Sequence, residues 1–539
     1  MQTCGVALSR LLEQYGVEVV FGIPGNHTLE LYRGLDTSPI RHVTTRHEQG
    51  AAFMADGYAR ASGKVGVCFL ISGPGLLNAA TALGQALADS VPMLVVSAVT
   101  AQADQGQGRG RLHDMPDQLG ATRGFCRHSL NLTQANDLPV LVDHAFTLLA
   151  QQRPGPIHLQ IPLDLMTAPV PTALFPKPSA AARPKVCVPA PVHQALLHSR
   201  SPLLLLGGGA VHAAPTDLAQ LAQRLDAPVL NTVNAKGLIP PSHPLAVGGS
   251  PSLDCLQQAI NAADLVIAIG TEFGETDYDL LMAEPLARRG QLLRIDIDAD
   301  QLHSNQRADY PLLGDAADWV PALLRAMPTT ASRNGAQRAQ SLRAAIQAEF
   351  HYHPDMARLF AVLKSVSPQL TIVGDSTRPT YYATWHCEPD APRHYFHSVS
   401  GFGTLGYAIP AAMGAALGSP DPVVALIGDG GAQFTLPEFA TAMDNELAVT
   451  FIIWCNRGYE EIENSLAGRS VSNRSTAISA PDFALIGAAY GMSVYQPKDW
   501  HTLQTDLPRA VAQAQQSRKP NLLLLQQDQL LSAPSGQWY

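Results

Sequence analysis

The segment "VVALIGDGGAQF", residues 423–434, gives the clearest indication of the fold class. Its apolar run, 423–427, is short and bounded by glycine, which indicates a buried strand. Strands buried on both faces belong to parallel sheets whose crossover helices cover them. Ligands of such sheets bind beyond the carboxyl ends of the strands, so Asp429, between Gly428 and Gly430, stands where a ligand is expected.

The same alternation of short apolar runs with helix-length amphipathic segments extends along the chain. It predicts an α/β protein with three doubly wound parallel-sheet domains, because 539 residues are too many for one core. We expect the first domain at residues 1–170 and a middle domain at 192–330, separated by a Pro-rich linker at 171–191. A linker helix at 331–350 then leads to the third domain at 351–539.

Composition and charge argue against several classes of protein. The chain is 46% hydrophobic and 15% charged, and its net charge of −9 disfavours nucleic-acid and membrane-surface partners. No apolar run is long enough to span a bilayer, and the first residues lack a signal-peptide pattern. The seven cysteines are scattered without a CxxC pair, so we expect a reduced, cytoplasmic protein without disulfides or a zinc site.

A second strand-to-turn segment, "VTFIIWCNRGY" at residues 449–459, adds polar groups of the same kind. If its strand neighbours 423–427, the Asn456 side-chain oxygen and the Gly458 carbonyl lie close to the Asp429 carboxylate. Oxygen ligands suit Mg²⁺, and the amides of flanking glycines suit a diphosphate. Either polar side chain alone could be an ordinary turn former, but the pair favours a metal site.

The "GDG" at 428–430 and the "CN" at 455–456 resemble the GDG…NN motif of thiamine diphosphate (ThDP) enzymes, with cysteine replacing the first asparagine. The resemblance implies that Mg²⁺ is held by Asp429, Asn456 and Gly458. It further implies that the diphosphate end of the cofactor contacts these ligands and several neighbours, namely Gly428, Gly430, Gly431 and Tyr459.

Segments of the first domain resemble the pyrimidine-binding part of the same family: "FGIPGNHTLELY", "RHEQGAAFMADGYAR" and "SGPGLLNAATALGQALADSVPMLVVS". The resemblance implies that Glu48 binds and activates the pyrimidine ring. In "SGFGTLGYAIPAAMGAALG", it implies that Leu405 supports the bent cofactor and that the Gly403 carbonyl accepts from the aminopyrimidine. Ser376 and Thr377 of "GDST" are then expected to contact the diphosphate.

The resemblance covers nearly the whole chain and implies ThDP and Mg²⁺ as cofactors, while we expect no FAD. It implies decarboxylation of a small-molecule 2-oxo acid to an aldehyde and CO₂. In the family, Glu48 and Asp429 of one active site come from different subunits. We therefore expect a homodimer with shared active sites, paired into a homotetramer.

Substrate-handling residues are less regular within the family. Related decarboxylases often place a histidine where "FLISGPG" has Ile71, so His113 of "GRGRLHDMPDQ" is a candidate proton donor in its place. Asn26 is a second candidate catalytic residue and Asp114 a candidate substrate contact. A solvated loop side chain is the alternative interpretation of His113 and Asp114, and it is the interpretation favoured for His27.

Three acids follow the metal-binding turn in "YEEIENSL", residues 459–466. Glu460 and Glu463 are explained by the partial positive charge of a helix start. Glu461 and Ile462 fall where related decarboxylases contact the substrate. A carboxylate in a partly buried pocket needs a cationic partner, and a guanidinium provides two parallel hydrogen bonds. The motifs are most similar to those of 5-guanidino-2-oxopentanoate (2-ketoarginine) decarboxylases, which agrees with such a substrate.

Three other interpretations compete with this one. An acetohydroxyacid synthase-like carboligase acting on pyruvate shares the "SGPG" segment. A catalytically silent subunit could retain ThDP binding, although Glu48, Asp429 and Asn456 argue for activity. A nicotinamide dehydrogenase could use the turn at 207–209, but His212 stands where a dinucleotide-binding motif needs its third glycine.

Overall fold

The computed structural model describes residues 2–171, 175, 185–278, 286–327, 332–349, 352–476 and 478–532. The chain divides into two compact units. The first comprises residues 1–181, 373–376 and 401–527, and the second comprises 182–372, 377–400 and 528–539. The predicted domain boundaries stay predictions, and most of the proposed linker at 171–191 lies outside the described residues.

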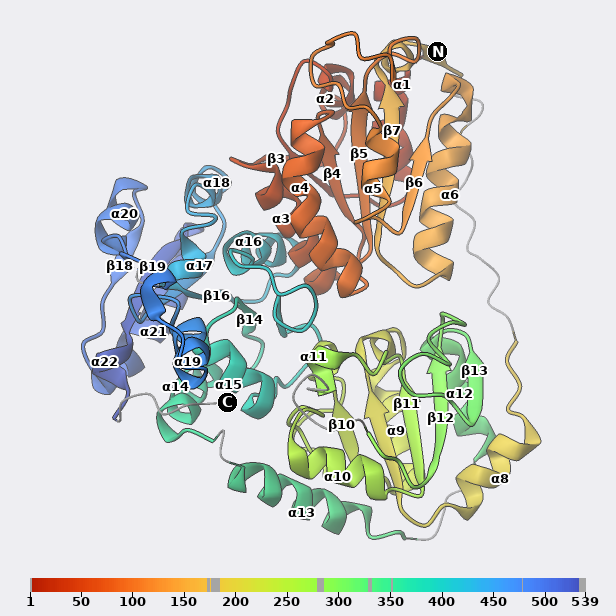
Figure 1. Ribbon diagram of the computed structural model, residues 1–539, viewed down its shortest axis with the longest axis vertical. Coiled ribbons are helices and arrows are strands. Elements are labelled where there is room, and N and C mark those ends of the chain that lie inside the picture. Colours follow the sequence, from red (N-terminus) through yellow and green to blue (C-terminus); the bar gives the residue numbers. More distant parts are fainter. Residues whose placement is uncertain are drawn as a thin grey trace. The chain divides into compact units, whose positions relative to one another are not determined.

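The N-terminal part of the first unit contains a six-stranded sheet with parallel neighbours throughout (Figure 1). Its strand order is β3-β2-β4-β5-β7-β6, so β2 pairs with β3 on one side and β4 on the other. Such a switch point opens a ligand-binding crevice beyond the ends of the two central strands. The strands are β2 (Val19–Gly22), β3 (Arg41–Thr44), β4 (Gly66–Leu70), β5 (Met93–Val99), β6 (His128–Asn131) and β7 (Pro156–Pro162).

Alternate residues of each strand point to opposite faces of this sheet, and helices pack against both faces. Val67 and Phe69 of β4 join a hydrophobic cluster to which α1, α2 and α6 contribute. Cys68, between them, donates its thiol to the Ala51 carbonyl of α3 at 3.6 Å. The helices are α1 (Cys4–Gln14), α2 (Leu29–Leu35), α3 (Glu48–Ser62), α4 (Pro74–Ala88), α5 (Gln118–Thr122), α6 (Leu138–Gln151) and α7 (Leu163–Met166), and a short antiparallel pair joins β1 (Gln2–Thr3) to β8 (Pro169–Val170).

The C-terminal sheet has the order β15-β14-β16-β17-β19-β18. Its first strand along the chain, β14, has β15 on one side and β16 on the other, so the strand order reverses there as it does at β2. The turns after β14 and β16 therefore lie side by side at the switch point. The strands are β14 (Thr371–Gly374), β15 (Tyr395–His397), β16 (Val423–Gly428), β17 (Val449–Cys455), β18 (Ser493–Tyr495) and β19 (Asn521–Gln526). The helices are α14 (Pro354–Val366), α15 (Arg378–His386), α16 (Ala408–Gly418), α17 (Asp429–Ala432), α18 (Glu438–Asp444), α19 (Glu460–Gly468), α20 (Phe483–Ala489), α21 (Trp500–Ser517) and α22 (Gln527–Leu530).

Close packing of α3 on α16 joins the two halves of the first unit. A Cβ atom on Gly57 would lie 2.0 Å from the Ala411 carbonyl oxygen, and one on Gly414 would lie 1.9 Å from that of Met54. Only glycine permits this backbone approach. The helix that starts with Glu48 is thereby held against the helix that follows Leu405.

The middle sheet belongs to the second unit and has the order β10-β9-β11-β12-β13, also parallel. Leu204 and Leu206 of β9 enter one hydrophobic cluster, while Leu203 and Leu205 enter another on the opposite face. The prediction of three doubly wound parallel sheets is therefore confirmed. The strands are β9 (Pro202–Leu206), β10 (Val229–Asn231), β11 (Leu265–Ile269), β12 (Gln291–Asp296) and β13 (Tyr310–Leu313), and the helices are α8 (Ala190–His198), α9 (Pro215–Leu225), α10 (Asp254–Ala262), α11 (Glu275–Tyr278), α12 (Ala316–Ala326) and α13 (Gly335–Ala348).

The glycine turn after β9 serves packing within this sheet. A Cβ atom on Gly207 would lie 2.2 Å from the Gly270 carbonyl oxygen, and one on Gly209 would lie 3.0 Å from the Gly270 Cα. The glycines thus let the turns after β9 and β11 approach each other, which supports the structural interpretation of the motif.

Two whole-chain properties follow from the described residues. None of the helices in the described ranges combines the length and the apolar character needed to cross a bilayer. All seven cysteines are free thiols, in agreement with the expectation of no disulfide framework.

Candidate active site

Asp429 begins α17 at the end of β16, and its side chain is buried. β16 and β17 pair in parallel from Val423 with Val449 to Gly428 with Trp454, so the turns after both strands are neighbours, as the sequence predicts. The Arg457 backbone N–H donates to Asp429 Oδ2 at 2.6 Å. Burial raises the Asp429 pKa, and the N–H groups of residues 456–458 oppose that rise.

The other carboxylate oxygen, Asp429 Oδ1, is buried and has no hydrogen-bond partner among the residues that the structure describes. Buried polar atoms are normally satisfied, so this oxygen fits a divalent cation. Asn456 Nδ2 donates to Glu460 Oε2 at 2.9 Å. The side-chain oxygen, Asn456 Oδ1, is therefore the atom of this amide that is suited to a metal. Gly458 lies two residues further on, and the three predicted ligands therefore meet in one pair of turns.

This donor set suits Mg²⁺ more than a softer metal, because it consists of one carboxylate, one amide oxygen and one main-chain carbonyl. Within the described ranges, no group of three or more His, Cys, Asp or Glu side chains could hold a metal ion. The Tyr459 ring packs on Gly430, where an added Cβ would lie 2.6 Å from Tyr459 Cε1. An added Cβ on Gly431 would lie 3.0 Å from Asp375 Oδ1, so bare backbone is needed throughout this turn.

Asp375 ties the turn after β14 to the start of α16. Its buried carboxylate accepts from the backbone N–H groups of Ser376 at 2.9 Å, Gly406 at 3.3 Å and Ala408 at 2.9 Å. Burial raises its pKa to about 6, against the lowering effect of these donors. The "GDST" turn and the end of the Leu405 loop are thereby fixed to each other, although the sequence drew attention only to Ser376 and Thr377.

The Leu405 loop is also anchored on α4. Gln85 Oε1 accepts from the Thr404 hydroxyl at 2.9 Å and from its backbone N–H at 3.3 Å. Gly403 has φ of +76°, a left-handed conformation that favours glycine, and it is exposed. Leu405 is half-buried. Thr377 is buried and belongs to the second unit, where it is the N-cap residue of α15.

Glu48 is the first residue of α3 and is 8% exposed. Its Oε2 accepts from Asn78 Nδ2 of α4 at 2.9 Å. An added Cβ on Gly75 would lie 3.3 Å from Glu48 Oε1 and 2.6 Å from Ile71 Cγ1. Ile71 also packs on Gly25, where an added Cβ would lie 2.6 Å from Ile71 Cγ2. The turns after β2 and β4 thus bring Ile71 close to Glu48.

His27 and His113 meet beside these turns. Their rings pack edge to face with centroids 5.1 Å apart, and His27 Nδ1 lies 2.6 Å from the buried Ser72 Oγ. Desolvation and the neighbouring His113 lower the His27 pKa, which favours the neutral ring. The expectation that His27 is simply solvated is therefore wrong. Asn26, next to it, is exposed.

His113 and Asp114 occupy a loop that is held near the same turns. His113 has φ of +58°, and its backbone carbonyl would lie 2.6 Å from a Cβ on Gly73. Thr100 Oγ1 donates to Asp114 Oδ1 at 3.3 Å. Both side chains are half-buried, so the interpretation of a freely solvated loop does not describe them.

Glu438, in the C-terminal half of the first unit, holds the two residues that directly precede α3. This carboxylate, 1% exposed, accepts from the backbone N–H groups of Arg46 at 3.1 Å and His47 at 3.0 Å, and from the Thr441 hydroxyl at 2.7 Å. Burial raises its pKa. No local sequence pattern indicates this contact, because Glu438 and His47 lie 391 residues apart.

The predicted substrate residues lie in α19. Glu461 is half-buried, whereas Ile462 is 57% exposed in the single chain. Helix α19 buries none of its residues fully. The structure therefore places Glu461 and Ile462 on the helix that follows the metal-binding turn.

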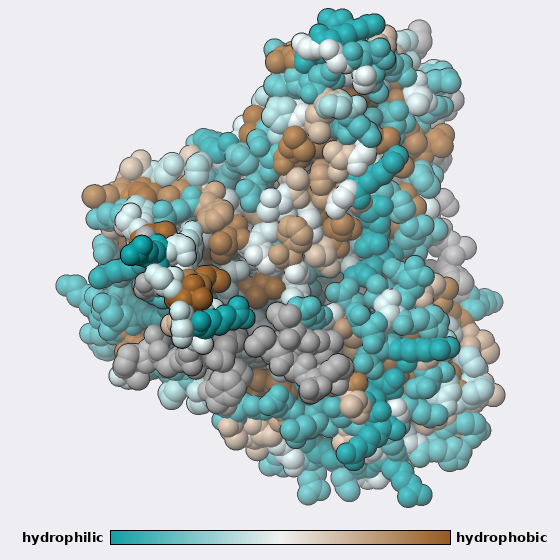
Figure 2. All heavy atoms as spheres, viewed as in Figure 1, coloured by the Kyte–Doolittle hydropathy of each residue, from teal (hydrophilic) through white to brown (hydrophobic). Residues whose placement is uncertain are grey.

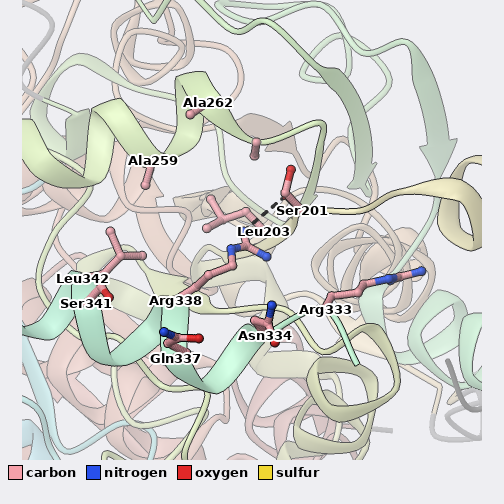
Figure 3. Close-up of a pocket in the computed structure, with 11 residues that line it drawn as sticks. Ser201, Leu203, Ala259, Ala262, Arg333, Asn334, Gln337, Arg338, Ser341 and Leu342 are labelled. Atoms are coloured by element: carbon pink, nitrogen blue, oxygen red, sulfur yellow. Dashed lines mark hydrogen bonds between the residues drawn. The ribbon is translucent and has the colours of Figure 1, made fainter. Parts of the chain in front are cut away.

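A separate pocket of about 500 Å³ lies in the second unit (Figure 3). Arg333 donates there to the carbonyls of Leu225 and Leu196, at 2.9 and 3.0 Å, and Arg338 to those of Ser201 and Pro202, at 3.3 and 3.0 Å. Both guanidinium groups thus cap backbone carbonyls, and none of the predicted site residues lines this pocket.

Three protein-family models match the chain in the order that the sheets suggest. The N-terminal TPP binding domain of thiamine pyrophosphate enzymes matches residues 2–121, the central domain 190–323, and the C-terminal TPP binding domain 374–524. The chain belongs to the thiamine pyrophosphate (diphosphate) enzyme family. The predicted cofactor class is therefore confirmed, and the roles of individual site residues stay predictions.

Relatives from two functional groups of this family cover most of the chain. "Probable 2-ketoarginine decarboxylase AruI" of Pseudomonas aeruginosa is 43% identical over 95% of this chain and 92% of its own length. The acetolactate synthase isozyme 3 large subunit of Escherichia coli is 30% identical over 94% and 92%, and an acetolactate synthase of Arthrospira platensis is 31% identical over 95% and 92%.

Proposed function

We propose that this ThDP-dependent 2-oxo acid decarboxylase uses Mg²⁺ and acts on a cationic 2-oxo acid of the guanidino class. The metal site is supported chiefly by the buried Asp429 Oδ1, for which the described part of the chain offers no hydrogen-bond partner, and by the neighbouring turn that contains Asn456. Asp429, Asn456 and the Gly458 carbonyl would hold Mg²⁺ and, through it, a diphosphate. The glycine amides of the same turn would bind the remaining phosphate oxygens.

Glu48 would act at the other end of the cofactor. ThDP supplies a carbon nucleophile and an electron sink for decarboxylation. The Glu48 carboxyl, held by Asn78 in a largely buried position, would exchange a proton with the pyrimidine ring. Leu405, on a loop anchored by Gln85, would keep the cofactor bent.

The side chains near Ile71 would handle the substrate. Ile71 offers an apolar surface close to Glu48. His113 is the proposed proton donor to the reacting carbon after CO₂ leaves, Asn26 is a second proposed catalytic residue, and Asp114 is a proposed substrate contact. General acids contribute on the order of 10²–10⁴-fold to such steps, so these loop residues are worth testing individually.

Glu461 is the proposed recognition group for the cationic end of the substrate. It is half-buried in the first turn of α19, where a guanidinium would provide a charged partner through two hydrogen bonds. The relative with 43% identity carries the name of a 2-ketoarginine decarboxylase, which supports this substrate class. Ile462 would pack against the aliphatic part of the same substrate.

A homodimer with shared active sites, paired into a tetramer, remains our proposed assembly. Several large apolar side chains of the first unit are exposed in the single chain: Leu77 48%, Phe402 60%, Phe434 51% and Ile462 57%. Figure 2 shows one face on which apolar patches interrupt a mainly polar surface. Contiguous exposed apolar patches are typical of surfaces that contact another chain, so measurement of the molecular mass in solution is the direct check of this assembly.

A substrate comparison tests the proposed activity. Wild-type protein, supplied with ThDP and Mg²⁺, is expected to release CO₂ from 2-ketoarginine in preference to an uncharged 2-oxo acid of similar length. Glu461→Gln should raise KM for 2-ketoarginine much more than for the uncharged substrate. Glu463→Gln, a matched change in the same helix, should leave both KM values unchanged; equal effects of the two variants would contradict the role of Glu461.

Carboligation is the second candidate, because two relatives are acetolactate synthases at 30 and 31% identity. Incubation with pyruvate should then yield acetolactate, a product that decarboxylation to acetaldehyde does not give. FAD, which we expect to be absent, would be visible as flavin absorbance of the purified protein. A protein that binds ThDP but turns over neither substrate would support the third possibility, a silent binding subunit.

A further inference from the structure

A directed chain of hydrogen bonds ends on the proposed metal ligand Asn456. The Trp454 indole Nε1–H donates to Gln527 Oε1 at 2.7 Å. Gln527 Nε2 donates to Glu460 at 2.9 Å (Oε1) and 3.0 Å (Oε2). Asn456 Nδ2 donates to Glu460 Oε2 at 2.9 Å. These hydrogen bonds join four side chains, which come from β17, the turn after it, the start of α19 and the start of α22. Figure 1 shows where these elements lie around the C-terminal sheet.

The hydrogen-bonding chemistry of Trp454 and Glu460 fixes the orientation of the two side-chain amides. These amides belong to Gln527 and Asn456. An indole nitrogen can only donate, so Trp454 directs the oxygen of Gln527 toward itself and the Gln527 nitrogen toward Glu460. A carboxylate can only accept, so Glu460 holds the Asn456 nitrogen. The Asn456 oxygen must then point away from Glu460. A flipped amide would set its oxygen against the carboxylate and offer N–H groups, which cannot ligate, to the metal.

We propose that Glu460 is a positioning residue that orients Asn456 for Mg²⁺, and that Trp454 and Gln527 hold Glu460 in place. This inference rests on the metal site of the proposed function. It also revises the interpretation of Glu460 as a carboxylate that merely complements a helix start. Partners behind metal ligands are typically worth about 10- to 100-fold in metal affinity.

The first test compares two charge-removing changes in one helix turn. The Mg²⁺ dissociation constant is measured by calorimetry on metal-free protein with ThDP in excess. Glu460→Gln should raise this constant about 10-fold or more, since it places a donor beside Gln527 or Asn456. Glu463→Gln removes the same charge from the same turn and should leave the constant unchanged.

The second test exchanges the amide and the carboxylate in the double variant Asn456→Asp with Glu460→Gln. The introduced amide would donate to the introduced carboxylate and accept from Gln527 through its single oxygen, so each neighbouring pair keeps one hydrogen bond and the direction is reversed only between positions 456 and 460. Net charge is also conserved. Because a carboxylate at position 456 also attracts Mg²⁺ directly, the double variant is compared with both single variants. It should bind Mg²⁺ more tightly than Glu460→Gln and than Asn456→Asp alone, in which two carboxylates face each other.

These measurements test the positioning role of Glu460 separately from the existence of the metal site. Equal Mg²⁺ affinity of Glu460→Gln and Glu463→Gln would overturn the positioning role while leaving the metal site intact, and so would a double variant no better than Glu460→Gln. Failure of the wild-type chain to bind Mg²⁺ with ThDP would overturn the proposed function itself.

Discussion

Replacement of Glu438 by alanine probes how the first unit holds Glu48 in place. The Glu438 carboxylate is the acceptor for the backbone N–H groups of Arg46 and His47, directly before α3. A Cβ atom on Gly50, in the first turn of α3, would lie 2.3 Å from Glu438 Oε1, so the carboxylate fills the space beside this turn. Glu438→Ala therefore removes both the acceptor and the packing that support the start of α3.

The expected loss of local stability follows from the two backbone N–H groups, of Arg46 and His47, that lose their acceptor. A hydrogen bond to a charged group is worth about 1.5–3 kcal/mol, and water can partly replace the carboxylate because Arg46 and His47 are exposed, so the loss of both bonds should cost about 2–4 kcal/mol of local stability. At about 1.4 kcal/mol per factor of ten, amide hydrogen exchange of the first turn of α3 should accelerate roughly 30- to 700-fold. Activity should fall as well, because Glu48 loses its fixed position.

Asp444→Ala is the matched control in the same helix. Asp444 pairs with Arg46 at 2.5 Å, but the two side chains are 59 and 34% exposed, so the pair is worth about 0–1 kcal/mol. Exchange monitored by mass spectrometry should change less than about 5-fold in this variant. If Glu438→Ala exchanges no faster than Asp444→Ala in residues 46–52, the proposed support of Glu48 is wrong.

Three further predictions concern individual side chains. Glu48→Gln should lower kcat by about 100-fold or more without a comparable change in ThDP affinity, as measured by steady-state kinetics and calorimetry; an unchanged kcat would remove Glu48 from the mechanism. Burial raises the pKa of Asp375 from 3.8 to about 6, so the folded state binds the proton more tightly, and this contribution to stability is lost as pH rises through that window. The unfolding free energy of the wild type relative to Asp375→Asn should therefore fall from about pH 4 to about pH 6, and a difference that rises over this range would contradict the assignment. Gly75→Ala should displace Ile71, since the new Cβ would lie 2.6 Å from Ile71 Cγ1, and should raise KM for the 2-oxo acid; an unchanged KM would place Ile71 outside the substrate site.

Much of the fold and part of the site could be predicted because they depend on local patterns. Short apolar runs ending in glycine identify parallel strands, and the carboxyl ends of such strands mark the ligand side of a sheet. Asp429 and Asn456 were therefore predictable as neighbours, and their strands do pair in register. The role of Glu48 was predicted from the resemblance of its segment to the family, and it stays a prediction.

The remaining contacts depend on tertiary packing that a sequence pattern does not encode. Glu438 meets His47 across 391 residues, and Gln527 meets Glu460 across 67. Glu460 looked like an ordinary first-turn acid because its partner Gln527 follows a different strand. His27 looked solvated because nothing in the sequence places it against Ser72 and His113, which reach it from separate loops.

Calorimetric titration of the purified chain with ThDP, first with Mg²⁺ and then with EDTA in its place, shows directly whether Mg²⁺ at Asp429 is needed to hold the cofactor. We predict saturable binding with Mg²⁺ that is lost in EDTA and in an Asp429→Ala variant with an unchanged circular dichroism spectrum. Binding that persists equally in EDTA and in Asp429→Ala would contradict this prediction, and so would a folded wild-type chain with no affinity for the cofactor.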